Sequence, residues 1–330
     1  MSRAIAVILP NWIGDAVMAT PALQCLRGWA GVDARIEGFG PPDVLDLLRG
    51  IPSLSTLHEL PPRGLLPSRA LALSQRLRAG CFDCGVLFSN GLGVAIAAWL
   101  GGIGERVGYD RRGRSRFLTN PLTPPRLDGR LSPVPAIDYY LALVHALGAA
   151  EGRPPMALKI SPNDEAAAAP VRSVFADRRE YPMVILNNNA ARSEAKLWPV
   201  GFMADLAQRI AGACDVNVLV LGAPGHEPRA AQTAQLAGHS HVRSATPSGL
   251  GPLKACLRHA ALVVTTDSGV RAIAAAFGVP LISLFGPTDP RWTLLHVANE
   301  IMIEERQHHR MASLPVERVW AAVQQRLGRT

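Results

Sequence analysis

The chain has 330 residues, of which 48% are hydrophobic and 18% are charged. This composition excludes a largely disordered chain, and the length exceeds what one hydrophobic core usually supports, so two domains are expected. The formal net charge of +8 favours partners that carry phosphate, but nucleic acid is not expected, because no zinc-finger spacing occurs and the few aromatic residues are not interleaved with basic ones.

The first half of the chain alternates predicted strands and helices. An apolar run at 4–9 predicts a strand, and a helix-like stretch at 16–29 follows it after a tight turn. Further strands are expected at 34–38 and 84–88, with helices at 68–77, 92–100 and 137–147. Between 110 and 135 the pattern breaks into arginine, glycine and proline, and 152–162 has the character of a linker. The alternation is typical of a parallel sheet with crossover helices.

The same alternation resumes in the second half. Strands are expected at 183–186, 217–221, 262–265 and 281–285, with helices at 200–211, 227–236, 253–260, 270–277 and 316–327. The sequence therefore predicts an α/β protein with two doubly wound domains, at 1–160 and 161–330. The last helix is expected to pack back towards the first domain.

Cysteine usage and hydropathy indicate a cytoplasmic chain. Five cysteines are scattered along it, and its start lacks the charged and apolar regions of a signal peptide. Cys81 and Cys84 form a C-x-x-C, but no second pair completes a zinc site, so buried thiols are favoured. No apolar run reaches the roughly 18 residues of a membrane span. Any work on lipid would therefore take place at a membrane surface.

The strongest local signal is the run 265–269, which ends an apolar strand and begins an alanine-rich helix. In open α/β sheets, ligands bind beyond the carboxyl ends of the strands, and the free amide groups of a helix start bind phosphate. Asp267 or Ser268 could instead merely cap the helix. Nucleotide binding is favoured, because a second loop, 286–290, is expected at the same sheet edge.

Two further loops carry polar residues at strand ends. Asn187, Asn189 and Arg192 follow one strand and lead to Lys196, just before a helix. On its own such a lysine is commonly a surface residue, but opposite the Asp267 loop it could stabilise the charge on a leaving diphosphate. In the first loop, Asp15 could accept a proton from an incoming hydroxyl, or could equally be the N-cap of the helix beginning at Ala16.

Several motifs carry a family resemblance over nearly the whole chain. The run 11–23 resembles the start of the lipopolysaccharide heptosyltransferases of glycosyltransferase family nine, most closely their heptosyltransferase II type. Gly108-Tyr109, the Lys196-x-Trp198-Pro199 run, 266–269 and 284–290 follow in that family's order. The resemblance implies a GT-B type fold, in which two Rossmann-like domains face each other across a cleft.

The resemblance also implies a reaction. The enzyme would move L-glycero-D-manno-heptose from ADP-heptose to the Kdo and heptose inner core of nascent lipopolysaccharide, with inversion, without a metal or other cofactor, and with transient contact to the cytoplasmic face of the inner membrane. The first domain would bind the acceptor and the second the nucleotide sugar. Asp15 would be the base and Lys196 the diphosphate partner.

The resemblance and the loop positions together assign the remaining candidate residues. The donor would contact Asn187, Asn189, Arg192, Gly222, Glu227, Thr266, Asp267, Ser268 and Gly269. The acceptor would contact Asn11, Arg111, Arg112 and Arg114. A solvated basic loop is the alternative for these arginines.

Two departures from the family pattern qualify this reading. Ala272 stands where the family usually carries a histidine, three residues after the glycine of the aspartate turn, and Arg271 could compensate only by turning inward. The segment 306–311 is short and lacks the family's cysteine, and its adjacent histidines are not expected to share a metal. The alternatives are a different donor or acceptor, or a catalytically weak nucleotide-binding paralogue.

Overall fold

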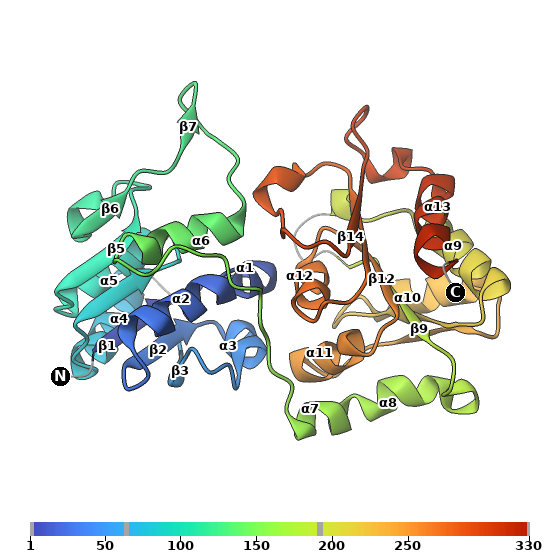
Figure 1. The fold of residues 1–330 in the computed structure, drawn as a ribbon, viewed down its shortest axis with the longest axis horizontal. Helices are drawn as coiled ribbons and strands as arrows, with labels where there is room; N and C mark the ends of the chain where they lie inside the picture. The colour runs from blue at the N-terminus through green and yellow to red at the C-terminus, as the bar shows by residue number, and fades with distance from the viewer. Residues whose placement is uncertain (1–2, 63–65, 190–193, 329–330) are drawn as a thin grey trace. The chain divides into compact units, whose positions relative to one another are not determined.

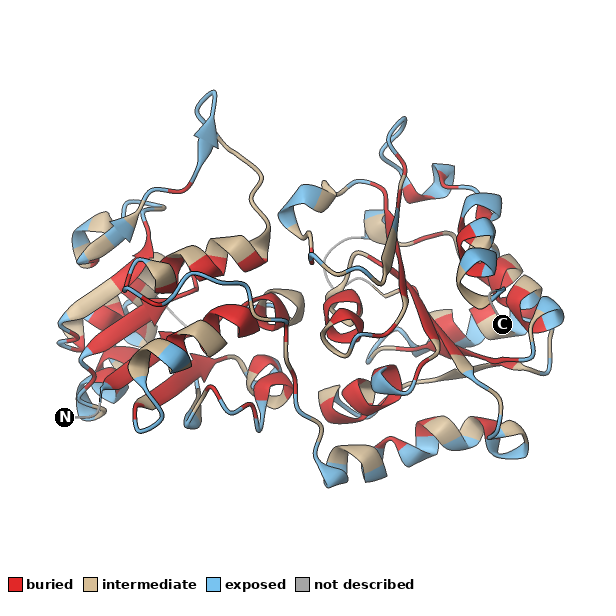
Figure 2. Cartoon of the chain, in the orientation of Figure 1, coloured by how far each residue is buried: buried red, intermediate tan, exposed pale blue. Residues whose placement is uncertain are grey.

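The chain folds into two compact units. The computed structural model describes residues 3–62, 66–189 and 194–328. The first unit comprises Met1–Lys159 with Arg291–Leu295, and the second comprises Ile160–Pro290 with His296–Thr330 (Figure 1). Both have buried strands and helices whose outer faces are exposed (Figure 2).

A six-stranded parallel sheet forms the centre of the first unit, in the order β3-β2-β1-β4-β5-β6. Its strands are β1 (Ala4–Ile8), β2 (Arg35–Gly40), β3 (Thr56–Glu59), β4 (Cys84–Leu87), β5 (Glu105–Tyr109) and β6 (Asn120–Leu122). The strand β1 is buried on both faces: Ala6 and Ile8 pack with the helices α4 (Leu66–Ala79) and α5 (Leu92–Leu100), and the alternate residues Ile5 and Val7 are also fully buried. Burial on both faces explains the continuous apolar run in the sequence.

The remaining elements of the first unit include two helices where the sequence predicts one. The predicted helix at 16–29 is α1 (Ile13–Met18) followed by α2 (Thr20–Ala30). Pro21 lies in the first turn of α2, where its missing N–H costs no hydrogen bond, so a new helix begins there. The other elements are α3 (Pro42–Leu48), α6 (Ala136–His145), a short 3₁₀ turn η1 (Ser115–Phe117), and the antiparallel hairpin β7 (Arg126–Leu127) and β8 (Arg130–Leu131).

The second unit repeats this topology. Its parallel sheet has the order β11-β10-β9-β12-β13-β14. The strands are β9 (Met183–Asn187), β10 (Asn217–Leu221), β11 (Val242–Ala245), β12 (Leu262–Thr266), β13 (Leu281–Phe285) and β14 (Glu300–Glu304). The helices are α7 (Pro162–Ala167), α8 (Ala169–Arg172), α9 (Val200–Ala213), α10 (Glu227–Ala237), α11 (Leu250–Arg258), α12 (Gly269–Ala276) and α13 (Val316–Leu327). Short 3₁₀ turns are η2 (Ser173–Arg178), η3 (Glu194–Lys196), η4 (Pro290–Trp292) and η5 (Met311–Ser313).

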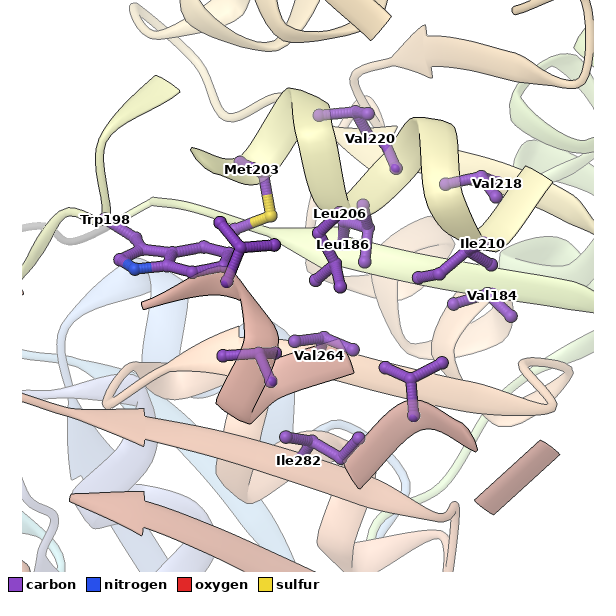
Figure 3. Close-up of a cluster of buried hydrophobic side chains, with 14 of the residues drawn as sticks. Val184, Leu186, Trp198, Met203, Leu206, Ile210, Val218, Val220, Val264 and Ile282 are labelled. Atoms are coloured by element: carbon purple, nitrogen blue, oxygen red, sulfur yellow. The ribbon is translucent and has the colours of Figure 1, made fainter. Parts of the chain in front are cut away.

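One hydrophobic cluster of the second unit lies on one face of this sheet. Val184 and Leu186 of β9 pack with Leu206 and Ile210 of α9 (Figure 3). Residues of the last helix, α13, belong to the same cluster, with Val319 and Val323 fully buried. The apolar face of α13 is therefore used within the second unit.

The structure confirms two doubly wound α/β units and adds strands that the sequence reading lacked. The strands β3, β5, β6, β11 and β14 were not expected, nor were the short helices α3, α7 and α8. Most of these strands carry polar residues or are partly exposed: β5 begins with Glu105 and Arg106, and β14 begins and ends with glutamate. Such short mixed segments lack the apolar run on which the prediction depends.

Candidate active site

The loop between β12 and α12 has an open helix start. Ser268 is the N-cap residue of α12 and has extended backbone angles, but no side chain of the described residues caps this helix. The Ser268 hydroxyl instead accepts from the Asn187 amide at 3.1 Å and lies 3.2 Å from the Thr265 hydroxyl. The simple capping alternative therefore does not hold for Ser268. The first N–H groups of α12, beginning at Gly269, keep their capacity to bind an anion.

Two asparagines hold three strand ends together beside this loop. The Asn187 side-chain amide donates to the Thr265 hydroxyl at 2.8 Å, which joins β9 to β12 at the point where the strand order reverses. The Asn189 amide donates to the Asn187 side chain at 2.9 Å and to the Leu221 carbonyl at 2.8 Å. Asn187 is fully buried. This corrects the prediction of a direct donor contact for Asn187, which instead shapes the site.

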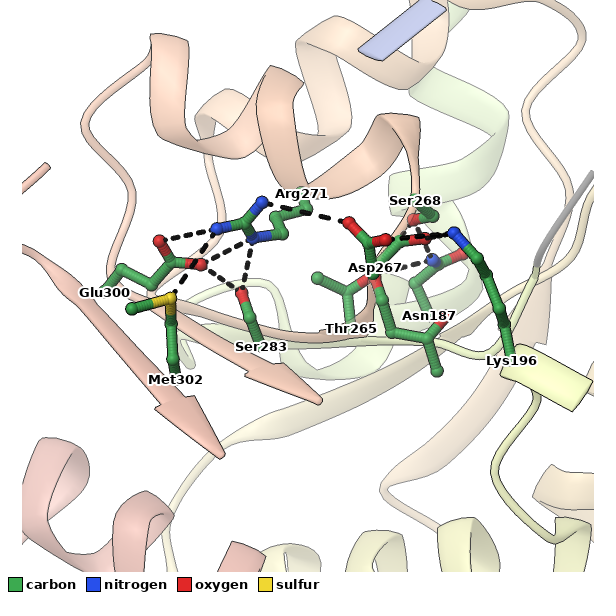
Figure 4. Close-up of polar contacts among 10 residues, drawn as sticks. Asn187, Lys196, Thr265, Asp267, Ser268, Arg271, Ser283, Glu300 and Met302 are labelled. Atoms are coloured by element: carbon green, nitrogen blue, oxygen red, sulfur yellow. Dashed lines mark hydrogen bonds and ion pairs between the residues drawn. The ribbon is translucent and has the colours of Figure 1, made fainter. Parts of the chain in front are cut away.

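Lys196 and Asp267 form an ion pair at this sheet edge (Figure 4). The Lys196 ammonium lies 2.9 Å from Asp267 Oδ2 and 3.5 Å from the Asp267 carbonyl oxygen. The Lys196 side chain is 26% exposed and that of Asp267 11%. The two residues are 71 positions apart, and the fold brings them together as the strand-end rule predicts. A positive group thus stands beside the open start of α12.

Asn188, which is not among the site residues predicted from the sequence, fixes the segment that carries Lys196. Its side chain accepts from the Trp198 N–H at 2.9 Å and donates to the Trp198 carbonyl at 2.7 Å. The Trp198 indole donates in turn to the Leu314 carbonyl at 2.9 Å, and this tryptophan is fully buried. The run of three asparagines is the signal in the sequence, but it does not distinguish Asn188 from its two neighbours.

Arg271 turns inward from α12 and is 2% exposed. Its guanidinium binds the Glu300 carboxylate of β14 through two bonds, Nε to Oε1 at 2.6 Å and Nη2 to Oε2 at 3.0 Å. Its third nitrogen, Nη1, lies 3.9 Å from Asp267 Oδ1. The side chain of Arg271 therefore has the inward orientation that the sequence alone leaves open. Glu300 was missed, because nothing in its local sequence marks it as buried.

The other candidate donor residues occupy different environments. The Thr266 hydroxyl is buried and has no hydrogen-bond partner among the described residues. Glu227 is exposed in the first turn of α10. A Cβ on Gly222 would lie 2.0 Å from the Thr246 hydroxyl, so packing alone requires a glycine at this position. Arg192 lies outside the described residues.

Asp15 lies in the first turn of α1 in the first unit. The N-cap of α1 is Trp12, so the alternative that Asp15 caps the helix is wrong. Asp15 is half-buried. Burial, and then the charge of Asp15, raise the pKa of the nearby Tyr140 hydroxyl well above its usual value. The Asn11 amide on the same loop lies 3.5 Å from the Ser89 hydroxyl, which follows β4.

Arg114 is a buried structural residue, unlike its neighbours in the basic loop. Its guanidinium donates to the carbonyls of Ser89 at 2.6 Å and Tyr109 at 2.7 Å and to the Asn90 side chain at 3.2 Å. Burial lowers the pKa of Arg114 to about 10, so it stays charged at neutral pH. The prediction of an acceptor contact by Arg114 is therefore corrected. Arg111 is half-buried and Arg112 is exposed, and both remain candidates.

The segment 306–311 is organised by Glu305. The buried Glu305 carboxylate accepts from the backbone N–H groups of Gln307 at 3.0 Å, His308 at 2.9 Å and Arg310 at 3.2 Å. Burial alone would raise the pKa of Glu305, but these bonds lower it. Across residues 3–62, 66–189 and 194–328, no three or more His, Cys, Asp and Glu side chains gather as metal ligands. Nor does any helix there have the length and apolar character to cross a membrane.

A separate cavity of 730 Å³ lies at the opposite edge of the second sheet. It is lined by Met183 and Asn217, the first residues of β9 and β10, together with Arg172, Arg258 and His259. Ligands of open parallel sheets bind at the carboxyl ends of the strands, so this cavity is not the candidate donor site.

Comparison with known proteins identifies similar sequences over most of the chain. Residues 70–316 match glycosyltransferase family 9 (heptosyltransferase). The chain is 27% identical over 325 residues to lipopolysaccharide heptosyltransferase 2 of Escherichia coli, covering 92% of this chain and 89% of that protein. It is 27% identical over 305 residues to lipooligosaccharide heptosyltransferase 2 of Haemophilus influenzae, covering 88% and 85%.

Solved structures of similar fold cover the whole chain. The structure of E. coli ADP-heptose lps heptosyltransferase II superposes with a TM-score of 0.82 at 21% identity, over 98% of each chain. That of glycosyl transferase family 9 from Veillonella parvula superposes with a TM-score of 0.87 at 19% identity, over 100% of this chain and 99% of the other. The predicted fold class, with two Rossmann-like units of GT-B type, is confirmed.

Proposed function

The chain belongs to glycosyltransferase family 9, and we propose that it moves L-glycero-D-manno-heptose from ADP-heptose to the Kdo and heptose inner core of lipopolysaccharide. The proposal is supported by the heptosyltransferase relatives along most of the chain. The observation that carries it is the Lys196–Asp267 pair beside the uncapped start of α12.

The donor would bind the second unit through its diphosphate. The N–H groups that begin α12 and the Lys196 ammonium are the positive groups at this edge of the sheet. Negative charge grows on the diphosphate as the sugar leaves, so these groups would stabilise the transition state more than the bound donor. Asp267, Ser268, Asn189 and Glu227 would complete the donor contacts.

The acceptor would bind the first unit, with Asp15 as the general base. In a single displacement, the acceptor hydroxyl transfers its proton to the Asp15 carboxylate while its oxygen forms a bond to the anomeric carbon. The bond from that carbon to the diphosphate breaks, and its electron pair stays on the leaving oxygen. Attack from the opposite face inverts the anomeric centre. Asn11, Arg111 and Arg112 would contact the acceptor.

The reaction would proceed without a metal ion, since Lys196 and the α12 amide groups supply positive charge at the leaving group. The enzyme would work in the cytoplasm with transient contact to the inner membrane, where its acceptor is made. Transfer that is abolished by EDTA and restored by a divalent ion would contradict the metal-free part of the proposal.

A two-stage experiment tests the proposal. Thermal shift with ADP, UDP and GDP on the purified protein reports donor class, and the expected result is stabilisation by ADP only. Transfer is then followed by mass spectrometry with ADP-heptose and Kdo- or heptose-terminated acceptors. Heptosylated product supports the proposal, whereas stabilisation by ADP without product would favour a nucleotide-binding paralogue, which Ala272 motivates. A melting temperature that no nucleotide changes would overturn both the heptosyltransferase proposal and the nucleotide-binding paralogue.

A further inference from the structure

Four charged side chains of alternating sign lie in a row that includes the Lys196–Asp267 pair of the candidate donor site (Figure 4). Glu300 contacts Arg271 at 2.6 Å, Arg271 approaches Asp267 at 3.9 Å, and Asp267 contacts Lys196 at 2.9 Å. Their side-chain exposures are 4%, 2%, 11% and 26% in that order. The line therefore runs from a buried ion pair to a lysine at the open end.

Contacts with Glu300 and its neighbours hold the Arg271 guanidinium in one place. Glu300 engages two of the three guanidinium nitrogens, and the Ser283 hydroxyl lies 3.2 Å from Nε. The guanidinium carbon also lies 4.9 Å from the centre of the Phe285 ring. A bidentate carboxylate contact fixes the plane of the guanidinium. The remaining nitrogen, Nη1, is thus directed at Asp267 Oδ1.

The two oxygens of Asp267 therefore have different partners. Oδ1 lies toward Arg271, which is buried, and Oδ2 contacts Lys196, which is partly exposed. Each cation close to a buried carboxylate offsets part of the cost of taking its charge out of water. With Arg271 in place, Asp267 keeps a cation when Lys196 moves away.

We propose that Arg271 is a positioning residue for the donor, which holds Asp267 by Oδ1 so that Lys196 can exchange Oδ2 for the diphosphate. This inference rests on the proposed function. Glu300 acts through Arg271 by fixing its orientation. Of this buried pair, Arg271 lies nearer to Asp267, so the pair presents its positive member towards the incoming phosphates.

The test removes the buried pair without leaving a lone charge. In Arg271→Leu combined with Glu300→Leu, net charge is unchanged, and replacing a buried ion pair by apolar residues is commonly tolerated. Isothermal calorimetry should show ADP binding weakened by about 10- to 100-fold. Adenosine, which lacks phosphate and is titrated by NMR, should bind with less than a twofold change. A general structural defect would weaken both.

A matched control removes another bidentate arginine–carboxylate pair from the second unit. Arg209 binds Asp205 through two contacts of 2.8 Å on α9, away from the strand ends. Arg209→Leu with Asp205→Leu should leave ADP affinity unchanged. The conservative variant Arg271→Lys keeps a positive charge but loses the bidentate contact, so it should bind ADP with intermediate affinity. It replaces the double variant in the test if that variant does not fold.

The outcomes separate this inference from the proposed function. Wild-type protein that binds no ADP would overturn both. The wild-type protein could bind ADP and transfer heptose while the variants at residues 271 and 300 bind ADP with the wild-type affinity. That result would overturn the role of Arg271 alone. Equal loss of ADP and adenosine binding in both the double variant and Arg271→Lys would reduce Arg271 to a structural residue.

Discussion

The two units share one strand order but differ in the chemistry of their carboxyl edges. In both sheets the order reverses between the first and fourth strands of the unit, and a polar side-chain pair joins the ends there: Asn11 and Ser89 in the first unit, Asn187 and Thr265 in the second. In the first unit the buried cation, Arg114, is bound to carbonyl groups. In the second, the buried Arg271 is bound to a carboxylate.

This difference shows that the topology sets where a site lies, whereas the loops set its charge. The first edge offers the half-buried carboxylate of Asp15, whose charge, after burial, raises the pKa of Tyr140. The second offers the Lys196–Asp267 pair and an open helix start. We therefore expect the first unit to serve proton transfer and the second to serve phosphate binding. Two predictions test that division, and two more test the structural roles of buried charges in the two units.

The largest effect is expected at Asp15. Asp15→Asn removes the proposed base and should lower the rate of heptose transfer by about 10²- to 10⁴-fold. ADP affinity should not change, because the diphosphate would contact the second unit only. Calorimetry with ADP and a transfer assay measure the two quantities. Full turnover in this variant would remove Asp15 from the mechanism.

Lys196→Met should affect both quantities. It removes a positive group from the leaving diphosphate, so the transfer rate should fall by about 10²- to 10³-fold. ADP affinity should fall as well, which distinguishes this variant from Asp15→Asn. Lys159→Met, an exposed lysine of the first unit, is the control and should change neither. An unchanged ADP affinity in Lys196→Met would break the proposed division of roles.

Arg114→Met tests the structural side of the comparison. It leaves the carbonyls of Ser89 and Tyr109 without their buried donor, so the free energy of unfolding should fall by about 3 kcal/mol. Urea denaturation measures this loss, and ADP affinity should be retained. Arg112→Met, at an exposed position of the same loop, should change stability by less than about 0.5 kcal/mol. Equal stability of the two variants would contradict the assignment of Arg114.

The smallest effect is expected at Glu305 and depends on pH. Its pKa is lowered in the folded state, so its ionised form contributes stability above the ordinary value of 4.5, and this contribution is lost as the pH falls through the folded value. Glu305→Gln should therefore lower the melting temperature at pH 7, with a difference from wild type that narrows below about pH 4.5. Glu304→Gln, which removes a neighbouring ion pair with the exposed Arg306, should show a smaller difference at pH 7. A difference for Glu305→Gln that is independent of pH would contradict the role of its charge.

Much of the fold could be read from apolar runs. The strands β10 and β13 have the bounds that the sequence predicts, because their residues are buried on both faces and uniformly apolar or nearly so. The edge strand β14 could not be found in this way. It pairs with β13 in the register that places Leu281 opposite Glu300. These residues are 19 positions apart, and no local sequence pattern indicates their pairing.

The candidate site was predictable only in part. The strand-end rule placed Lys196 and Asp267 at one edge, and the structure pairs them. Sequence alone did not distinguish Asn187, which is buried, from Asn189, which is half-buried, because both follow the same strand. It also could not separate Arg114 from Arg112 in one basic loop. Burial in these cases depends on neighbours that are distant in the chain.

By itself the sequence determined two doubly wound units, the family, and the loops that carry polar groups at strand ends. It could do so because the periodicity of apolar residues, the apolar runs and the order of the motifs are properties of the sequence that need no packing to be seen. The tertiary structure alone decided which charges are paired and how deeply, as in the line from Glu300 to Lys196. The strength of an ion pair depends on distance and solvent exclusion, and both arise only when separate strands and helices pack together.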